Sequence, residues 1–428
     1  MLTAIRNAWA LLLGMLLLQI GNGLQTSALG VRGDVEGFSS ATLGYVMAGY
    51  FVGFLGGTQA TPWLLRRVGH VRVFAALASL ISAAFILFAA VVDPIAWFAL
   101  RVLVGFCISG IYVVTESWLN DSADNATRGQ TMSAYITAQV LGVVAAQGLL
   151  NVADISGYGL FVMMSVLVSI SFTPILLSAV AVPVFERTRR MSVRRLVETS
   201  PLGAVAMFLL GIVFACQFGM SAVYAANEGL STQQISIFVG MIFLAAVICQ
   251  PPIGWLSDRM DRRVLIIALA AIGGLGCLIV PLSGGGFIPL VVAAFVLGGV
   301  SNPLYSLIAA YVNDRLEPED MASASAGLIL LNGVGAMGSP IAVGYLMDAI
   351  GNDAFFGFMG IAFAAMVGYA LYRSTQRAAP SVEETGPMVP MTPISGQVAA
   401  DVAWEAAIDD MDPSADAPPN EVDLPGRT

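Results

Sequence analysis

The sequence has no lysine, one histidine and few charged side chains of any kind. Charged residues make up 11% of its 428 positions, about half the share that is usual in soluble domains, whereas 57% are hydrophobic. This imbalance excludes a water-soluble globular protein. All 19 basic residues are arginine and the 28 acidic residues outnumber them, so no basic field exists that could attract a nucleic acid as a partner.

Several patterns of catalytic and metal-binding residues are also absent. The four cysteines lie singly in apolar surroundings, and we interpret them as buried free thiols. His70 has no neighbouring ligands, so the sequence predicts neither a metal site nor a cofactor. The missing GxxxxGK(S/T) loop disfavours an ATP-driven pump, and the missing HExxH and GxSxG patterns disfavour a membrane-embedded enzyme.

The formal net charge of -9 arises in the C-terminal tail. Residues 1–377 hold 18 basic and 18 acidic side chains, whereas residues 378–428 hold ten acidic side chains against Arg427. The tail is rich in Pro, Ala, Asp and Glu and has no spanning run, so we predict that residues 374–428 are disordered. Residues 402–408, around Trp404, favour either a short amphipathic docking helix or a solvated stretch of the tail.

Long hydrophobic runs dominate the rest of the chain. A bilayer core about 30 Å thick requires roughly 20 apolar residues in a spanning helix. Twelve segments meet this requirement and predict an all-α integral membrane protein with twelve transmembrane helices. The first segment is too long for the apolar region of a signal peptide, so we expect an uncleaved anchor. The predicted spans are residues 8–31, 41–64, 73–92, 95–118, 131–152, 159–182, 203–225, 233–256, 264–283, 286–311, 322–346 and 354–372.

The distribution of arginine predicts how these spans are oriented. With the N-terminus in the cytoplasm, 17 of the 19 arginines fall in cytoplasmic loops or tails, leaving Arg32 outside and Arg101 within a span. The positive-inside rule therefore places both termini in the cytoplasm. We expect the protein to lie in the cytoplasmic (inner) membrane. An arginine-rich connection, residues 183–202, separates a six-helix bundle at 1–182 from a second at 203–373. Such a basic run can also contact anionic membrane lipids.

The two predicted bundles resemble each other in sequence. An EGFS motif precedes the second span and an EGLS motif precedes the eighth, 192 residues later. Two parallel six-helix repeats are a transporter architecture, with a binding site near the midplane between them. At an offset of 193, Gly105, Tyr112, Asn120, Gln139 and Gly142 align with Gly298, Tyr305, Asn313, Asn332 and Gly335.

Residues 1–375 resemble the major facilitator superfamily, most clearly in the loop after the eighth span. This loop reads GWLSDRMDRR over residues 254–263 and is similar to a family signature of Gly, then Asp-Arg, then two basic residues. The resemblance implies a latch that closes the cytoplasmic side; the alternative is a charge cluster that only sets topology. Gly254 would allow a close helix approach, and Asp258 would pair with arginine or cap a helix. The predicted gating residues are Gly254, Asp258, Arg259, Asp261, Arg262 and Arg263.

Other parts of the chain depart from the family pattern. The equivalent first-half loop has Arg66 where the acidic residue would lie, so we expect a latch in the second half only. Arg101 and Gly105 are spaced as in the family's fourth-helix arginine motif, but Val104 replaces its glutamine. The Gly-Pro antiporter signature is missing from residues 131–152, which weakens a drug-antiport interpretation. The motifs EGFS at 36–39, VVTES at 113–117 and NPLYSL at 302–307 are similar to the YcaD-type subgroup, which implies no substrate.

Arg101 and Glu116 are the two charged residues within the predicted spans. A charge at the bilayer centre is costly and usually marks function. Fifteen residues, about 22 Å of helix, separate the two, so they cannot pair, although they share a helix face with Tyr112. Glu116 is a candidate proton carrier, because burial disfavours its charged form; alternatively it reaches water or pairs with Arg128. Arg101 is a candidate for coupling or anion binding, or for structural pairing.

Further polar residues lie on spans 1, 4, 7 and 10, which the resemblance implies line the central cavity. Each of them could instead form hydrogen bonds between helices that stabilise the bundle. Pro303 is expected to interrupt the tenth span and free carbonyls near Asn302. Gly49, Gly53 and Gly57 predict a close helix contact. The candidate cavity residues are Gln19, Asn22, Gln25, Tyr112, Gln217, Tyr224, Asn302 and Tyr305.

Together these features predict a secondary active transporter that moves a small molecule by alternating access, coupled to protons and working as a monomer. A membrane sensor of transporter shape that binds without flux is the main alternative, and a membrane-embedded enzyme is the other. The sequence specifies neither the substrate nor the direction of transport.

Overall fold

The computed structural model describes residues 2–122, 125–177, 193–316, 318–376 and 388. These residues form α-helices and one π-helix, with no strand in the described ranges. The linker up to residue 192 lies outside the described residues. So does the predicted disordered tail, except for residues 374–376 and Met388.

The described helices fall into two groups, which we name the N-half (residues 2–177) and the C-half (residues 193–376). The N-half contains α1 (Leu2–Val35), α2 (Ser40–Val68), α3 (His70–Ala90), α4 (Pro94–Ser122), α5 (Asn125–Leu149), α6 (Gly159–Ser171) and α7 (Thr173–Leu177). The C-half contains α8 (Val193–Thr199), α9 (Pro201–Ala215), the π-helix η1 (Cys216–Met220), α10 (Ser221–Asn227), α11 (Thr232–Ser257), α12 (Arg262–Gly276), α13 (Ile279–Ser283), α14 (Phe287–Asn313), α15 (Pro318–Ile350) and α16 (Ala354–Ser374).

The helices correspond to the predicted spans. Within the described residues, eleven helical stretches are long and apolar enough to cross a membrane. The remaining predicted span is α2, whose 29 residues include several glycines and threonines together with Arg66 and Arg67, which makes it less apolar. Three spans are built from consecutive shorter helices: α6 with α7, α9 with η1 and α10, and α12 with α13. The predicted linker contains one short helix, α8.

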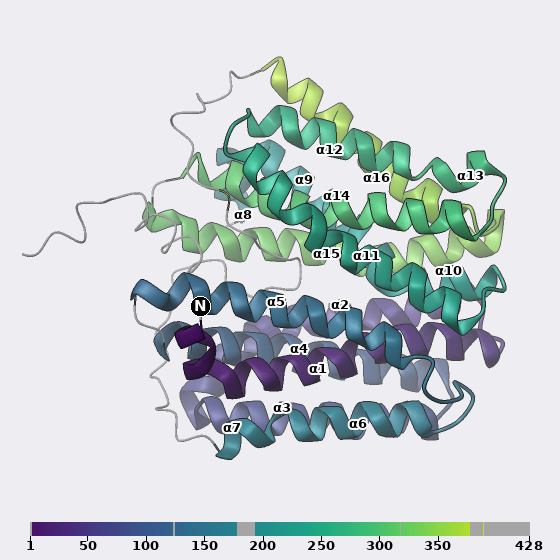
Figure 1. The fold of residues 1–428 in the computed structure, drawn as a ribbon. Helices are drawn as coiled ribbons and strands as arrows, with labels where there is room; N and C mark the ends of the chain where they lie inside the picture. The colour runs from purple at the N-terminus through teal and green to yellow at the C-terminus, as the bar shows by residue number, and fades with distance from the viewer. Residues whose placement is uncertain (1, 123–124, 178–192, 317, 377–387, 389–428) are drawn as a thin grey trace, which may run out of the picture.

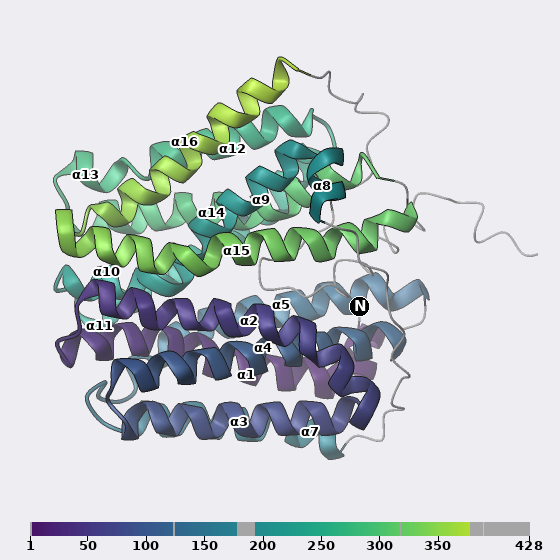
Figure 2. The ribbon, with the colours of Figure 1, turned by 180° about the vertical axis from the view of Figure 1, so that it is seen from behind.

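The two halves lie side by side, with their helices running in roughly the same direction (Figures 1 and 2). We call the end that carries the N-terminus and α8 the linker end, and the opposite end, where the α1–α2 and α10–α11 turns lie, the distal end. Across the interface α2 packs on α15, α5 on α11, and α1 on α10. Most of this contact between the halves is thus formed by three helices from each half.

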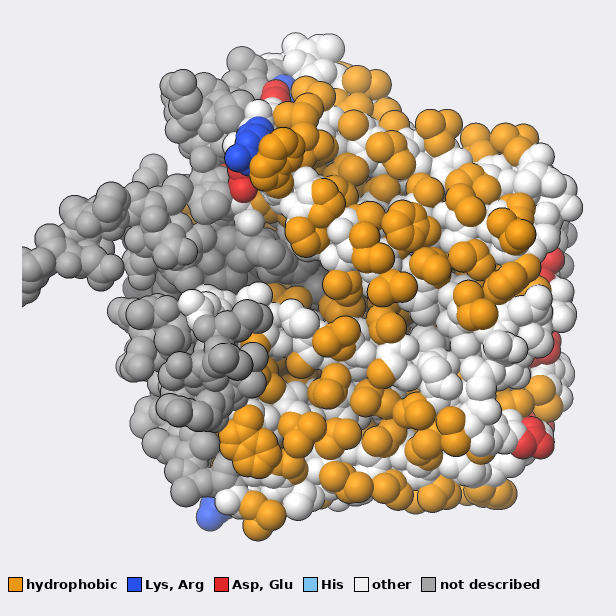
Figure 3. Space-filling view, viewed as in Figure 1, with side chains coloured by type: hydrophobic (Ala, Val, Ile, Leu, Met, Phe, Trp, Pro, Cys, Tyr) orange, Lys and Arg blue, Asp and Glu red, His pale blue; other side chains and the backbone are white. Residues whose placement is uncertain are grey.

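The surface is that of a membrane protein. Large apolar side chains such as Ile288 and Ile361 are more than two-thirds exposed, as expected where lipid replaces water. Hydrophobic side chains spread across the face between the two ends in Figure 3, and the arginines in view lie at the linker end.

Glycines set the spacing of the helices inside each half. A Cβ atom at Gly49, Gly53 or Gly57 of α2 would overlap carbonyl oxygens of α4, which confirms the predicted close contact. The aligned glycines of the two repeats have the same role. Gly105 abuts α2 at the Tyr50 carbonyl, and Gly298 abuts α11 at the Ile242 carbonyl.

The repeated EGFS and EGLS motifs form helix starts. Gly37 and Gly229 have positive φ angles of 76° and 69°, which glycine adopts without strain. Two residues later, Ser39 caps α2 and Ser231 caps α11, each accepting a hydrogen bond from a backbone amide of the first turn. The repeat in the sequence is therefore a repeated turn and N-cap.

The predicted interruption at Pro303 is wrong. Helix α14 continues through Pro303 from Phe287 to Asn313. Pro303 has no backbone N–H, so the carbonyl of Gly299 in the preceding turn loses its helical hydrogen bond. Packing against neighbouring helices keeps the helix intact, as is common in membrane helices. The irregular backbone of the C-half occurs instead in η1, on the span that carries Gln217.

Candidate functional site

A polar cluster lies inside the N-half around Arg101, which is fully buried. Its Nη1 donates to Gln25 Oε1 at 2.7 Å and to Thr26 Oγ1 at 3.2 Å, both from α1. The guanidinium also lies 4.8 Å from the ring centroid of Tyr50 on α2, where a cation–π interaction stabilises it. Asn22 donates to the Tyr50 hydroxyl at 3.5 Å. Three predicted site residues, Asn22, Gln25 and Arg101, are thus brought together.

A second cluster surrounds Glu116, nearer the linker end. Glu116 is fully buried in this structure, and the side chain of Arg128, its alternative partner, lies outside the described residues. The Tyr135 hydroxyl on α5 donates to Glu116 Oε1 at 3.2 Å. One turn earlier on α4, Tyr112 donates to Gln19 Oε1 at 2.9 Å. Tyr112 and Gln19 thus connect the two charged clusters through α1 and α4.

Tyr305 is a predicted cavity residue that the C-half contributes from α14. This residue is buried on α14 and aligns with Tyr112 of the N-half in the sequence repeat. Tyr135 was not among the predicted site residues, because α5 was not among the helices expected to line the cavity.

The C-half has its own buried polar cluster on η1 and α14. Gln217 Oε1 accepts from Ser301 at 2.8 Å, and Gln217 Nε2 donates to the Leu297 carbonyl at 3.5 Å. Asn302 is buried, and its Nδ2 has no acceptor among the described residues. A π-helix within an α-helical span is rare and is often found at functional sites.

Tyr224 lies apart from this cluster. Its ring stacks on Phe355 at 4.9 Å between centroids and contacts Phe356 and Phe238, which places it in an aromatic group near the distal end. The other cavity candidate of this span, Gln217, is seven residues away along the chain.

Aromatic rings join the two clusters across the interface. Phe218 of η1 contacts Tyr50 with ring centroids 5.4 Å apart and Phe51 with centroids 6.4 Å apart. Because Tyr50 also faces Arg101, the π-helix of one half and the buried arginine of the other contact the same ring.

Asp348 of α15 joins the two halves at the distal end. Its carboxylate oxygens accept from the backbone amides of Ser40 and Ala41, both at 2.9 Å. These are the first amides of α2, where the helix dipole favours a negative charge. Gly344, one turn before Asp348, lies against the Ser40 carbonyl with no room for a side chain. Asp348 was not singled out from the sequence, because its partner is 308 residues away.

Two asparagines add to the distal contact. Asn227 donates to the Ser40 hydroxyl at 2.7 Å, and Asn151 donates to the Ser236 hydroxyl at 2.8 Å, each bond crossing between the halves. Gly44 of α2 abuts the Pro340 carbonyl of α15. The distal end is therefore held by hydrogen bonds and by direct backbone contact.

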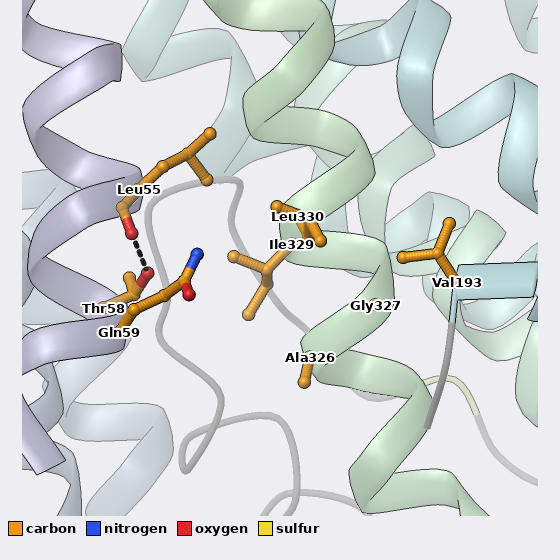
Figure 4. A pocket seen from close by; sticks show the side chains of 8 residues that line it. All are labelled: Leu55, Thr58, Gln59, Val193, Ala326, Gly327, Ile329 and Leu330. Carbon is orange, nitrogen blue, oxygen red and sulfur yellow. Dashed lines mark hydrogen bonds between the residues drawn. The ribbon is translucent and has the colours of Figure 1, made fainter. Parts of the chain in front are cut away.

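The linker end of the same interface contains a pocket. It has a volume of about 60 Å³ and separates α2 from α15 (Figure 4). The Thr58 hydroxyl donates back to the Leu55 carbonyl at 2.9 Å, whereas the Gln59 side chain extends toward Ile329. Helices α2 and α15 thus touch at one end and diverge at the other. The lining residues are Leu55, Thr58, Gln59, Val193, Ala326, Gly327, Ile329 and Leu330.

The predicted gating loop is folded onto the C-half. Arg262 is buried and forms an ion pair with Asp314 at the end of α14, and it lies 3.8 Å from Asp258. Asp261, rather than Asp258, caps a helix, accepting from the Arg263 amide at 2.8 Å.

The outer part of this loop is more exposed. Arg259 stacks 4.3 Å from the Trp255 ring, and Asp258 accepts from the backbone amide of Met388 at 2.8 Å. The close helix approach expected at Gly254 is not found, since a Cβ atom there would meet nothing within 4 Å. The gating role of this loop stays a prediction.

Two repeated helical halves, each with its own buried polar cluster, are the architecture of a multi-pass membrane transporter. Residues 11–196 and 203–408 match the sequence profile of the Major Facilitator Superfamily, and the chain belongs to that family. It is 25% identical over 358 residues to the uncharacterized MFS-type transporter YcaD of Escherichia coli strain 536, which covers 83% of this chain and 93% of that protein. The YcaD protein of Salmonella arizonae is also 25% identical, over 360 residues, with the same coverage.

Solved transporter structures share the fold. A variant of the nucleoside transporter NupG matches with a TM-score of 0.74 at 14% identity, covering 86% of this chain and 99% of that one. A bacterial homolog of the human lysosomal transporter Spinster, solved in an inward-facing and unoccupied conformation, matches with a TM-score of 0.65 at 15% identity, covering 95% and 97%. The predicted family, its YcaD-type subgroup and the all-α fold are thereby confirmed.

Proposed function

We propose that this protein is a proton-coupled secondary active transporter of a small molecule in the inner membrane, working by alternating access. The main support is the unequal packing of α2 against α15. At the distal end Asp348 and the glycines hold the two helices together, whereas at the linker end a pocket separates them. The buried polar clusters lie between these two ends, where alternating access requires a substrate site.

The charges of the two ends support an orientation with the linker end in the cytoplasm. Arg32 is the basic residue of the distal loops and helix ends, where it pairs with Glu36 among several other acidic residues. The linker end carries Arg66, Arg67, Arg72, Arg194, Arg195, Arg259, Arg262, Arg263, Arg315 and Arg373. Under the positive-inside rule this structure is an inward-facing conformation.

The opposite conformation would require two changes. The Asp348 bonds to the first turn of α2 would break, and the two halves would close over the pocket at the linker end. The loop around Asp258 lies at that end, so its proposed latch would act in the outward-facing state.

We assign the coupling of transport to protons to Glu116. A buried carboxylate is costly in its charged form, so binding a proton changes the stability of the conformation that surrounds it. Tyr135 of α5 donates to Glu116, so a change in the charge of Glu116 would alter a contact between α4 and α5.

Transport is testable with purified protein. A thermal-shift screen against metabolites and drugs would supply a ligand, and proteoliposomes would then be assayed for counterflow and for accumulation driven by a pH gradient. We expect both activities. Binding with no flux in either assay would contradict the transporter and favour a membrane sensor.

A further inference from the structure

We propose that the Arg101 cluster binds the carboxylate of a singly charged substrate that has an aromatic body. This inference rests on the proposed function, since it names the class of molecule transported. It is carried by three observations: the unused edge of the guanidinium, the charge around it and the aromatic rings beside it.

One edge of the guanidinium is free for a ligand. Nη1 is used by Gln25 and Thr26, but Nε and Nη2 are buried and have no acceptor among the described residues. These two nitrogens form one side of the planar fork and can donate two parallel hydrogen bonds to the oxygens of a carboxylate. Buried donors without acceptors are costly, so the cluster is stabilised most by a ligand that supplies an acceptor to each of the two nitrogens.

The charge of Arg101 favours a substrate with a single negative charge. Its contacts are neutral: an amide, a hydroxyl and an aromatic ring. No ion pair with Arg101 occurs within the part of the chain that the structure describes, and Glu116 lies about four helical turns away on the same helix. One carboxylate would neutralise the buried charge, whereas a second would add an uncompensated one.

The surroundings of the cluster suit an aromatic body. Phe51, Phe54 and Phe218 lie around Tyr50, with ring centroids 5.4–6.1 Å from it, and they come from both halves. These three rings keep 5–9% of their surface exposed, whereas Arg101 keeps none, so they are not fully covered by neighbouring side chains. Offset or edge-to-face packing on such rings favours an aryl group.

The test compares carboxylates with their amides on the purified protein in nanodiscs, by calorimetry and thermal shift. The probes are benzoate, phenylacetate and cinnamate, the three matched amides, and phthalate as a dianion. We expect at least one aryl monocarboxylate to bind tenfold or more tightly than its amide, and phthalate to bind more weakly. Equal affinity for an acid and its amide, or no binding by any of the three acids, would overturn the proposal.

Variants locate the site. We expect Arg101→Gln to weaken carboxylate binding about 10- to 100-fold while leaving the amide unchanged, because hydrogen bonds to a charged group are lost. Arg101→Lys, which keeps the charge and loses the fork, should lie between. Arg72→Gln, a loss of the same charge at an exposed position, is the matched control. Unchanged carboxylate affinity in Arg101→Gln would contradict the site.

This result is separable from transport. Carboxylate binding that depends on Arg101 but is followed by no flux would support the binding site and contradict the proposed transport function. Flux of a neutral compound that Arg101→Gln does not alter would support the transport function and contradict the carboxylate site. If the Arg101 variants fail to fold, the comparison of acids with amides on the unaltered chain still decides the question.

Discussion

Glu116 and Arg101 show how a single residue acts through its partners. Both lie on α4, about four helical turns apart, and each contacts side chains of other helices. Arg101 is held by α1 and α2, and Glu116 by Tyr135 of α5. The role of each charge therefore depends on side chains that helices other than α4 contribute.

At this scale we predict that Glu116→Gln separates coupling from exchange. The amide keeps the size and hydrogen bonding of the side chain but cannot take up a proton. Accumulation driven by a pH gradient should fall at least about tenfold, while counterflow stays within about twofold. Proteoliposome flux measures both.

Glu198→Gln is the control, because Glu198 is an exposed residue of α8 paired with Arg194. Intact accumulation in Glu116→Gln, equal to that of the control, would show that another group carries the proton.

The sequence could supply the two charges but not their partners. Arg101 and Glu116 stand out because charge is rare in apolar spans. Tyr135 and Thr26 have no such signal, since tyrosine and threonine are common in membrane helices and their partners depend on how helices pack.

Helix α2 is in close backbone contact with two other helices. One face lies against α4 along Gly49, Gly53 and Gly57, and its distal part lies against α15 along Gly44. Backbones in direct contact leave no space for side chains, so α2 can shift relative to its neighbours only by sliding or by separating.

We predict that Gly53→Ala destabilises the N-half while Gly56→Ala does not. A Cβ at Gly53 would overlap the Val102 carbonyl, whereas at Gly56 it would meet one side-chain atom of Phe106 at 3.7 Å. Overpacking of this kind costs about 1–3 kcal/mol. The melting temperature in detergent should fall by a few degrees for Gly53→Ala alone; equal values for the two variants would refute the packing argument.

Elements were predictable where local chemistry determines them. The glycine spacing of α2 and the repeated Gly-x-Ser helix starts have their cause within a few residues. The π-helix and the uninterrupted α14 do not. Both reflect packing against distant helices, which outweighs the local preference of a proline or of an ordinary helical turn.

For the whole molecule, the relevant equilibrium is between states open at opposite ends. The distal bonds of Asp348, Asn227 and Asn151 stabilise the state described here relative to one in which the halves part at that end. Any loss among them shifts the populations by the free energy of the lost contact.

We predict that Asp348→Ala increases the distal-open population about 3- to 10-fold, because a charged cap of a helix start contributes about 1 kcal/mol. Spin labels at Val35 and Ile350, both exposed near the distal end, would report longer distances. Asp353→Ala removes the same charge from a residue that makes no side-chain cap and should leave the distances unchanged. Identical distance distributions in both variants would count against the distal lock.

The architecture itself was predictable because hydrophobic length, arginine placement and internal repetition are properties of the chain alone. Which conformation the halves adopt was not, since it depends on contacts such as Asp348 with Ser40 that no local pattern announces.

The cap on α2 also bears on how the protein is assembled. The amides of Ser40 and Ala41 receive their acceptor from a residue made 308 positions later, whereas Ser39 serves the next amide from within the same turn. During synthesis the N-half can complete its own glycine-packed contacts, but the first two amides of α2 lack their carboxylate acceptor until α15 has been inserted. The distal seal is therefore among the last parts of the molecule to form, and a chain truncated before α15 lacks it altogether.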